Sequence, residues 1–227
     1  MKITFFFLML LLSNGSYAQF AIIKDNDGYV NIRSEAQKGN NISDKLENGF
    51  IVYGFEPDNN WVGIDYSKNN NDKSGYVYKD RIKYLSEFTK IPLTKETPTK
   101  VIFQKDSLNI VIESKKFDSK TAKLTYSKDK SFLTKINGKE IWGTDGNIPR
   151  TSYKLITIII GGKTIELPAN AYADLFEPAL SYTEINYNKK DDILYISSSN
   201  GDGAGGYELV WVIEKRKYKE RKIARGF

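Results

Sequence analysis

Acidic side chains in glycine-rich loops are the groups of this 227-residue chain that come nearest to catalytic or metal-binding chemistry. The loop 198–207 carries Asp202 in the order Asn-Gly-Asp-Gly, and the loop 142–149 repeats part of it around Asp145. Oxygen ligands that alternate with turn residues are typical of calcium loops. Two carboxylates at a fixed separation are also the requirement for hydrolysing a glycosidic bond. Asp145 and Asp202 are therefore the candidates for a calcium site, or for a carboxylate- or metal-dependent hydrolase together with Asp174 and Glu177.

The simpler interpretation of these loops is structural, and we favour it. Surface turns are where Asp and Glu usually lie. A calcium loop of the EF-hand type needs a third acid and a terminal Glu, and Glu208 follows Asp202 too closely for that role. A phosphate-binding loop is excluded because no Gly-Lys-Ser/Thr follows. We therefore assign no catalytic residue and expect no cofactor other than a possible calcium ion.

The composition removes the commonest hydrolase mechanisms. The chain contains no Cys and no His. A thiol nucleophile, a Ser-His-Asp triad and a His-ligated zinc site are therefore all excluded. The sequence predicts a protein that is not an enzyme.

The net charge of +6 does not indicate a nucleic-acid partner, because acids are interspersed with the bases along most of the chain. The exception is the basic segment 214–225. We favour a charged edge strand there, protected from aggregation by its lysines and arginines. The alternative is a patch for an anionic surface.

The first 18 residues have the pattern of a secretory signal peptide. Lys2 precedes the apolar run 3–12, and Ser16-Tyr17-Ala18 supplies small residues before a cleavage point. The apolar run is about half the length that a bilayer span requires, so no transmembrane segment is expected after cleavage. We expect a secreted or periplasmic protein that begins near Gln19.

Apolar and polar residues alternate over several short runs between positions 28 and 85, each bounded by Gly, Asn or Asp. This period of two indicates half-buried strands joined by turns, and therefore a small barrel. Four pieces occur in order: Gly28-Tyr29-Val30-Asn31-Ile32-Arg33, Leu46-Glu47-Asn48-Gly49, Asn60-Trp61-Val62-Gly63-Ile64 and Gly75-Tyr76-Val77. Residues 22–86 thereby resemble the bacterial SH3 (SH3b) domain, whose members often accompany cell-wall peptidases.

The resemblance implies a binding surface for peptidoglycan or for a protein or peptide ligand. Small barrels of this kind bind extended ligands in shallow grooves lined by aromatic rings, which offer large rigid faces. The candidate ligand-binding residues are Tyr29, Trp61, Tyr76 and Tyr78. Tyr53 is a further aromatic candidate, and Trp61 fits a core position under the barrel as well as a ligand contact. Asn31 and Arg33 are expected to brace the first loop.

The rest of the chain is also predicted to be β. The signal peptide 1–18 and the barrel 19–86 are followed by an extended Pro/Thr linker, 87–100, and by a second all-β domain, 101–227, of sandwich or half-open barrel type. Asn137-Gly138 and Gly161-Gly162 predict two-residue hairpins. The run 158–160 lacks alternation and predicts a strand covered on both faces, and 170–176 alone looks helical. This part resembles uncharacterised exported proteins of Bacteroidetes-type bacteria, which implies no activity.

Three hypotheses follow. In the first, the barrel is a binding module, and Tyr29, Tyr76 and Tyr78 are exposed in one groove. In the second, the protein has a structural or interaction role without wall binding, and the second domain covers these rings. In the third, the second domain is an enzyme, and Asp145 and Asp202 approach one another.

Overall fold

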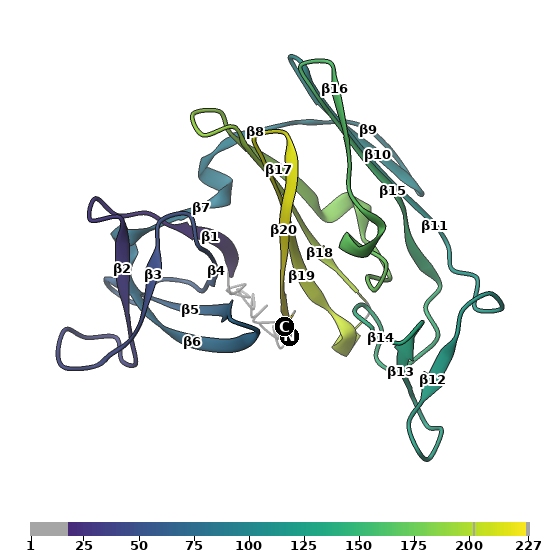
Figure 1. Cartoon of the computed structure of the whole chain (residues 1–227), viewed down its shortest axis with the longest axis horizontal. Helices are drawn as coiled ribbons and strands as arrows, with labels where there is room; N and C mark the ends of the chain where they lie inside the picture. Colours follow the sequence, from purple (N-terminus) through teal and green to yellow (C-terminus); the bar gives the residue numbers. More distant parts are fainter. Residues whose placement is uncertain (1–17, 202, 226–227) are drawn as a thin grey trace, which may run out of the picture.

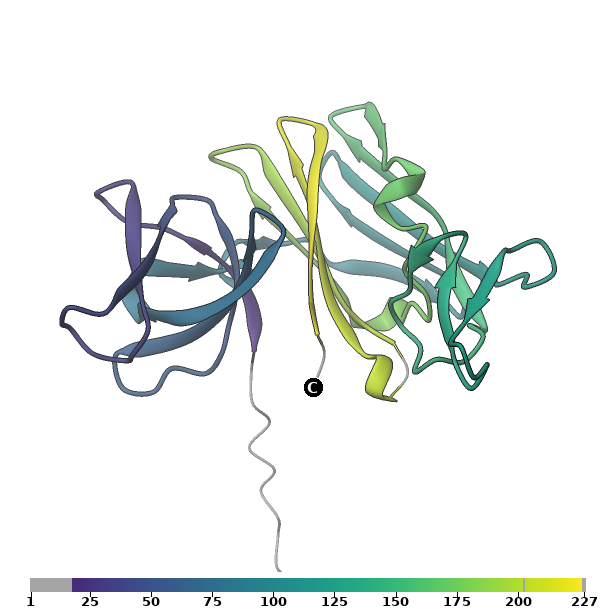
Figure 2. The ribbon, with the colours of Figure 1, turned by 60° about the horizontal axis from the view of Figure 1, so that its bottom comes forward.

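Alternating burial along the strands forms the layers of the protein, as in β11 (Leu108–Lys116), where every second side chain from Leu108 to Ser114 is buried. The computed structural model describes residues 18–201 and 203–225. It confirms the predicted all-β class. A curled N-terminal sheet, a central sheet and an outer sheet lie side by side in Figures 1 and 2. The helical elements of the described residues are short 3₁₀ turns: η1 (Lys79–Arg81), η2 (Leu85–Glu87), η3 (Ala169–Ala171), η4 (Leu180–Tyr182) and η5 (Gly203–Gly205).

The N-terminal sheet curls into a small half-barrel, called the barrel below. Its strand order is β3-β2-β6-β5-β4-β1-β7, with all the pairings antiparallel. Ile23, Ile32, Leu46, Val62 and Ile64 fill its interior. The strands are β1 (Gln19–Ile23), β2 (Tyr29–Arg33), β3 (Ile42–Glu47), β4 (Ile51–Gly54), β5 (Trp61–Lys68), β6 (Asn71–Tyr78) and β7 (Ile82–Tyr84).

The remaining strands form a β-sandwich with a small sheet beside it. The central sheet, β20-β19-β18-β17-β8, packs on the outer sheet, β16-β15-β11-β10-β9, and β12-β13-β14 stand apart. The central strands are β8 (Thr89–Lys90), β17 (Thr183–Asn188), β18 (Ile193–Asn200), β19 (Tyr207–Glu214) and β20 (Lys217–Arg225). The others are β9 (Leu93–Thr97), β10 (Lys100–Lys105), β12 (Leu124–Tyr126), β13 (Leu133–Ile136), β14 (Lys139–Glu140), β15 (Thr151–Ile160) and β16 (Lys163–Glu166).

The central sheet is covered on both of its faces. Trp211 of β19 is fully buried in the sandwich core with Ile110 and Ile156 of the outer sheet. Its neighbours Val210 and Val212 point the other way and pack against the barrel. This second cluster contains residues of β1, β4, η2, β18 and β19: Phe20, Ile22, Ile51, Tyr53, Leu85, Tyr195, Val210 and Val212.

The two predicted hairpin turns are confirmed. Ile136 pairs with Lys139 across Asn137-Gly138, and Ile160 pairs with Lys163 across Gly161-Gly162. Both central residues of each turn have positive φ, between 52° and 79°, as a turn of type I′ requires. The predicted helical segment 170–176 begins in the 3₁₀ turn η3 and continues as turns rather than as an α-helix.

The prediction that the run 158–160 is covered on both faces is wrong. Ile158 and Ile160 are buried, whereas Ile159 between them is only partly buried, so β15 alternates like its neighbours. The doubly covered strand is β19, because the barrel lies against the central sheet and not against the outer one. Since both strands read as continuous apolar runs, only the tertiary arrangement distinguishes them.

The segment predicted as a linker is extended but is not a free connector. It contains β8, which pairs with β17, and β9, which pairs with β10. Between these strands Ile91 is 1% exposed in the sandwich core, and its amide donates to the Ile185 carbonyl at 2.9 Å. The segment therefore crosses from the central sheet to the outer sheet.

The basic segment lies in β20, the edge strand of the central sheet, as predicted. Arg221 is the exception to a solvated edge. Its guanidinium donates to both carboxylate oxygens of Asp174, at 2.6 and 2.5 Å, and to the Ala171 carbonyl at 3.0 Å. Trp211 donates its indole N–H to the same carbonyl. These bonds hold the loop after η3 against the central sheet.

A second charged cluster joins β3 to the β5–β6 hairpin of the barrel. The Asp44 carboxylate accepts hydrogen bonds from Lys68 at 2.5 Å, from Lys73 at 2.8 Å and from the Tyr66 hydroxyl at 3.1 Å. The Lys68 and Lys73 ammonium groups hold the pKa of the Asp44 carboxyl well below its usual range. The ionised form of Asp44 therefore stabilises the barrel.

Replacing Arg221 with Met should lower the free energy of unfolding by about 3 kcal/mol, because the Asp174 carboxylate, 11% exposed, would lose its countercharge. The matched control is Lys219→Met on the same strand, whose ion pair with Glu214 is more exposed and whose loss should cost less than about 1 kcal/mol. Urea unfolding followed by tryptophan fluorescence measures both. Equal losses would mean that the Arg221 pair is not a structural anchor.

The contribution of Asp44 should depend on pH. An unfolded Asp has a pKa of about 3.9, and the folded value lies below it. The stabilisation by Asp44 is therefore complete above about pH 5. It is lost as the pH falls through the unfolded pKa toward the lower folded pKa. The difference in unfolding free energy between the wild type and Asp44→Asn should be large at pH 7 and should shrink by pH 3. Asp72→Asn on the exposed hairpin serves as the control, and a difference for Asp44→Asn that does not change with pH contradicts the expectation.

Candidate functional site

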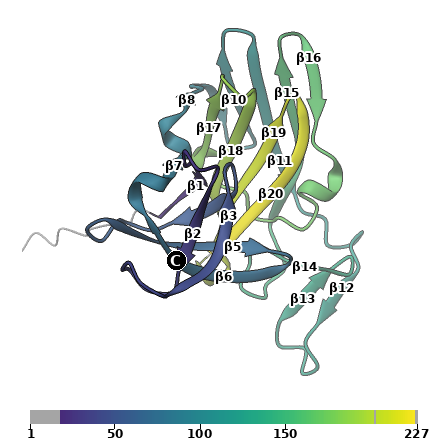
Figure 3. The same ribbon diagram turned by 60° about the vertical axis from the view of Figure 1, so that its left-hand side comes forward.

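Three of the four predicted ligand-binding residues lie together on the outside of the barrel. Trp61 of β5 pairs with Tyr78 of β6. Two residues further along the strands, Gly63 pairs with Tyr76. The intervening residues Val62 and Val77 point into the core, so alternation turns the rings outward. Figure 3, in which the barrel comes forward, shows β5 and β6 running side by side along its lower edge. We call Trp61, Tyr76 and Tyr78 the aromatic face.

The aromatic face is a partly exposed surface of packed rings. The Trp61 and Tyr78 rings meet edge to face, with their centroids 5.2 Å apart. Tyr76 is 37% exposed. Gly63 places no side chain between the Phe55 and Tyr76 rings, and a Cβ at this position would make ordinary contact with them, at 3.6 and 3.8 Å. Trp61 is thus a partly exposed member of this face and not a core residue.

A braced loop supplies positive charge at the edge of the aromatic face. Arg33 pairs with Tyr76 and donates to the Gly39 carbonyl at 2.8 Å and to the Asn41 side-chain oxygen at 2.7 Å. The guanidinium thereby fixes the loop 34–41, which is the bracing role expected for Arg33. From this loop the Lys38 ammonium lies 6.0 Å from the centre of the Tyr78 ring. Such a contact is weak at an exposed position, so Lys38 contributes a positive charge beside the aromatic face.

Tyr29 and Tyr53 lie elsewhere. Tyr29 is at the far end of β2, four residues or about 13 Å of strand from Arg33, and the Lys45 ammonium lies 3.5 Å from its ring centre. Tyr53 is 6% exposed, and its ring packs edge to face on Phe20 in the cluster beneath the central sheet. Neither residue extends the aromatic face.

The second domain does not cover the aromatic face through its main contact. The cluster that joins the two domains involves β1 and β4, and Trp61, Tyr76 and Tyr78 are not members of it. The binding-module hypothesis expected Tyr29, Tyr76 and Tyr78 in one groove, and Tyr29 does not share the surface of the other two. The interaction hypothesis expected the second domain to cover these rings, and the main contact between the domains does not include Tyr76 or Tyr78.

The acidic loops offered for calcium or catalysis come together only in part. Thr144 lies against Gly205, where a Cβ would meet it at 2.4 Å, so the loops around Asp145 and η5 are in contact. A hollow of about 370 Å³ lies between them. Asp202, the other candidate, is outside the described residues. Asp145 is exposed, and no group of three or more Asp, Glu, His or Cys suited to a metal occurs among residues 18–201 and 203–225.

The other two acids of the hydrolase hypothesis have structural partners. Asp174 is bound by Arg221, as described above. Glu177 accepts hydrogen bonds from the Arg150 amide and from the Thr151 hydroxyl, and it has positive φ. Both carboxylates therefore hold loops in place, and Glu177 also lines the hollow beside Asp145.

Sequence reasoning missed two features of the aromatic face. Gly63 gave a signal, because a glycine at an outward strand position often marks the close approach of another group. Lys38 gave none, since its place depends on the fold of an irregular loop. Sequence pattern could not separate Tyr29 from the other rings either, because β2 and β6 pair only at Arg33 and Tyr76.

Comparisons with known proteins add no further constraint. No protein-family model, no curated protein and no solved structure matches the chain. The interpretation of the site therefore rests on its own geometry.

Within the part of the chain that the structure describes, no helix has the length and apolar character needed to cross a membrane.

Gly63 and Gly75 in the β5–β6 hairpin should respond differently to substitution. Gly63→Ala places a Cβ at ordinary contact distance and should leave the free energy of unfolding unchanged or slightly raised. Gly75→Ala places a Cβ 2.5 Å from Ile32 and 2.9 Å from the Arg33 carbonyl, and should cost about 1–3 kcal/mol. Urea unfolding of both variants measures the difference, and similar stabilities would contradict the packing described for β6.

Proposed function

We propose that the protein is an exported, non-catalytic binding protein whose barrel holds an extended cell-wall polymer, peptide or glycan, on the aromatic face. The observation that carries this proposal is the row formed by Trp61, Tyr78 and Tyr76 on the outside of β5 and β6, where Gly63 opposite Tyr76 adds no side chain. Flat aromatic surfaces stack on sugar rings and on planar peptide groups at a low cost in side-chain entropy.

The dimensions of the row favour an extended ligand over a compact one. The Trp61–Tyr78 pair and the Gly63–Tyr76 pair are two residues apart along the strands, which is about 7 Å. Consecutive units of an extended polymer are spaced on the same scale. A ligand lying along β5 and β6 would contact the rings in turn, with its backbone over Gly63.

Charge supports a bacterial cell-wall polymer as the ligand. Peptidoglycan peptides carry free carboxylates, and Lys38 lies beside the aromatic face. The N-terminal pattern of residues 1–18 is that of an exported protein, which would meet this polymer. The resemblance to SH3b domains over residues 22–86 favours the same ligand by analogy of fold.

Co-sedimentation with purified peptidoglycan sacculi tests the proposal, using the mature chain of residues 19–227. The wild type should pellet at moderate salt. Trp61→Ala and Tyr76→Ala should each weaken the binding roughly tenfold, since aromatic anchors contribute most to such surfaces, and the double variant should remain in solution.

Tyr126→Ala is the matched control, because Tyr126 of β12 is 40% exposed and lies on the small sheet. Tyr29→Ala tests whether the far end of β2 takes part. Thermal unfolding of each variant shows that it is folded. If the double variant pellets like the wild type, or if Tyr126→Ala loses binding as strongly, the aromatic face is not the site.

A further inference from the structure

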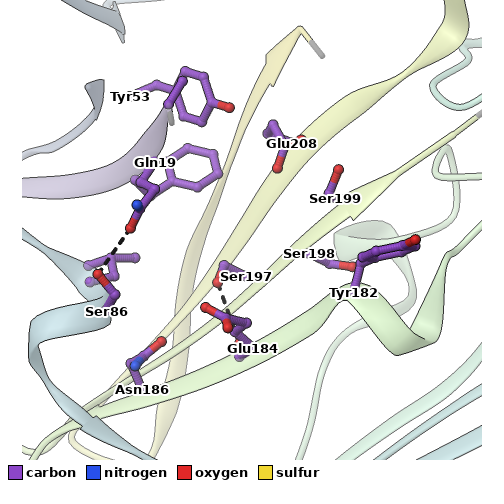
Figure 4. Close-up of a pocket in the computed structure, with 13 residues that line it drawn as sticks. Gln19, Tyr53, Ser86, Tyr182, Glu184, Asn186, Ser197, Ser198, Ser199 and Glu208 are labelled. Atoms are coloured by element: carbon purple, nitrogen blue, oxygen red, sulfur yellow. Dashed lines mark hydrogen bonds between the residues drawn. The ribbon is translucent and has the colours of Figure 1, made fainter. Parts of the chain in front are cut away.

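A polar pocket lies between the barrel and the central sheet, apart from the aromatic face. Its volume is about 190 Å³. Figure 4 shows its wall residues, which come from β1, β4 and η2 on the barrel side and from β17, β18 and β19 on the other. Sites for small ligands occur preferentially at such domain interfaces, where two surfaces supply groups that neither has alone.

Strand alternation explains why the pocket is polar. Val210 and Val212 point toward the barrel and pack against it, and Glu208 is the next residue of β19 on the same face. In the neighbouring strand Ser199 is opposite Glu208, and Ser197 is opposite Glu184 of β17. The apolar half of this face is thus in contact with the barrel, and the polar half lines the pocket.

Two nearly buried polar groups in the pocket have no hydrogen-bonding partner. Asn186 is 2% exposed, and its side-chain amide bonds to no group among the described residues. The Tyr53 hydroxyl, on a residue 6% exposed, likewise has none within residues 18–201 and 203–225. Neither group is fully sealed from solvent, because the fully buried side-chain atoms without a partner in the described residues are Asn109 Oδ1 and Thr144 Oγ1. The Asn186 amide and the Tyr53 hydroxyl are therefore open to the pocket and available to a ligand. The other buried asparagines of this sheet have partners, since Asn200 bonds to Tyr153 at 3.1 Å and Asn188 to Asp191 at 2.8 Å.

The pocket also holds a negative charge without a countercharge. Glu208 is largely withdrawn from water, and burial raises the pKa of its carboxyl, an effect that a hydrogen bond from Ser199 opposes. No Lys or Arg of the described chain forms an ion pair with it. Glu184 is different, because it is exposed and pairs with Lys90 at 2.8 Å. An uncompensated carboxylate in a partly dry site attracts a cation.

We propose that this pocket binds a small hydroxylated amine of amino-sugar size, with its ammonium group on Glu208 and its hydroxyls on Asn186 and Tyr53. A carboxylate is the partner that an ammonium group requires. The Asn186 amide both donates and accepts, and the Tyr53 hydroxyl does the same, so together they match alcohol groups.

Size and shape agree with a single ring. A volume of 190 Å³ is below the range of about 300–1,000 Å³ for drug-sized ligands. Tyr182 lies at the wall of the pocket and is 69% exposed (Figure 4), so its ring can pack on the apolar face of a sugar. Neither the residues nor the surface are those of the aromatic face, so this site does not depend on the polymer-binding proposal.

Isothermal titration of the mature chain with glucosamine tests the inference. Glucosamine should bind in a saturable manner, whereas N-acetylglucosamine and glucose, which lack the ammonium group, should bind at least about tenfold more weakly. Glu208→Gln should weaken glucosamine binding by a similar factor. Glu214→Gln lies on the same strand outside the pocket and should leave it unchanged.

A second variant guards against effects on folding. Ser199→Leu adds volume at an exposed position on the pocket wall and should abolish glucosamine binding while the unfolding temperature is maintained. The inference is overturned if glucosamine does not bind, if glucose binds equally well, or if Glu214→Gln weakens binding as much as Glu208→Gln does. Sacculus binding by the Glu208→Gln chain should be unchanged, which keeps this result separate from the aromatic face.

Discussion

The double covering of the central sheet is the constraint on which the rest of the structure depends. A sheet with two apolar faces is stable only if a second layer covers each of them. In β19 the residues Val210, Trp211 and Val212 are all buried, with Trp211 in the sandwich and the two valines toward the barrel. The barrel is therefore not attached by a flexible linker. It is the third layer of one packed structure, and its orientation is fixed by the surface that it buries.

This attachment decides which parts of the barrel remain available. Because the N-terminal sheet is curled, the outer sides of its strands point in different directions. The outer side of β1 and β4 meets the central sheet through Phe20 and Tyr53, whereas the outer side of β5 and β6 carries the aromatic face away from that contact. The outward side chains of β1 and β4 therefore pack against the central sheet, whereas those of β5 and β6 form a surface. The polar pocket follows from the same geometry, since it forms where the apolar half of the central sheet ends.

Local sequence predicted the features that depend on local physics. Period-2 alternation predicted the β class, and Asn137-Gly138 and Gly161-Gly162 predicted their turns, because these residues tolerate positive φ. The candidate ligand-binding residues came from the SH3b resemblance and included Tyr29, which lies away from Trp61, Tyr76 and Tyr78. The turn Lys215-Arg216 also has positive φ at both positions, yet neither residue type favours it, so packing of β20 imposes the turn. The runs 158–160 and 209–213 look alike in sequence, and only the position of the barrel makes the second one doubly covered. The pocket could not be predicted at all, because it joins Tyr53 to Asn186 across more than a hundred residues.

A chain of touching aromatic rings runs from the aromatic face to the pocket, but it is not expected to transmit an effect of binding from one to the other. Phe55 lies beside Gly63 and packs on Tyr53, which lines the pocket and whose ring centre is 6.0 Å from that of Phe55. A chain of touching rings transmits a signal only if it has two discrete arrangements that the two ligands stabilise differently. Here Tyr53 is fixed on its other side by Phe20, at 5.1 Å, in the cluster that joins the domains. A shift of that ring would disturb the interface on which the fold depends, so Tyr53 has one arrangement and does not couple the two surfaces.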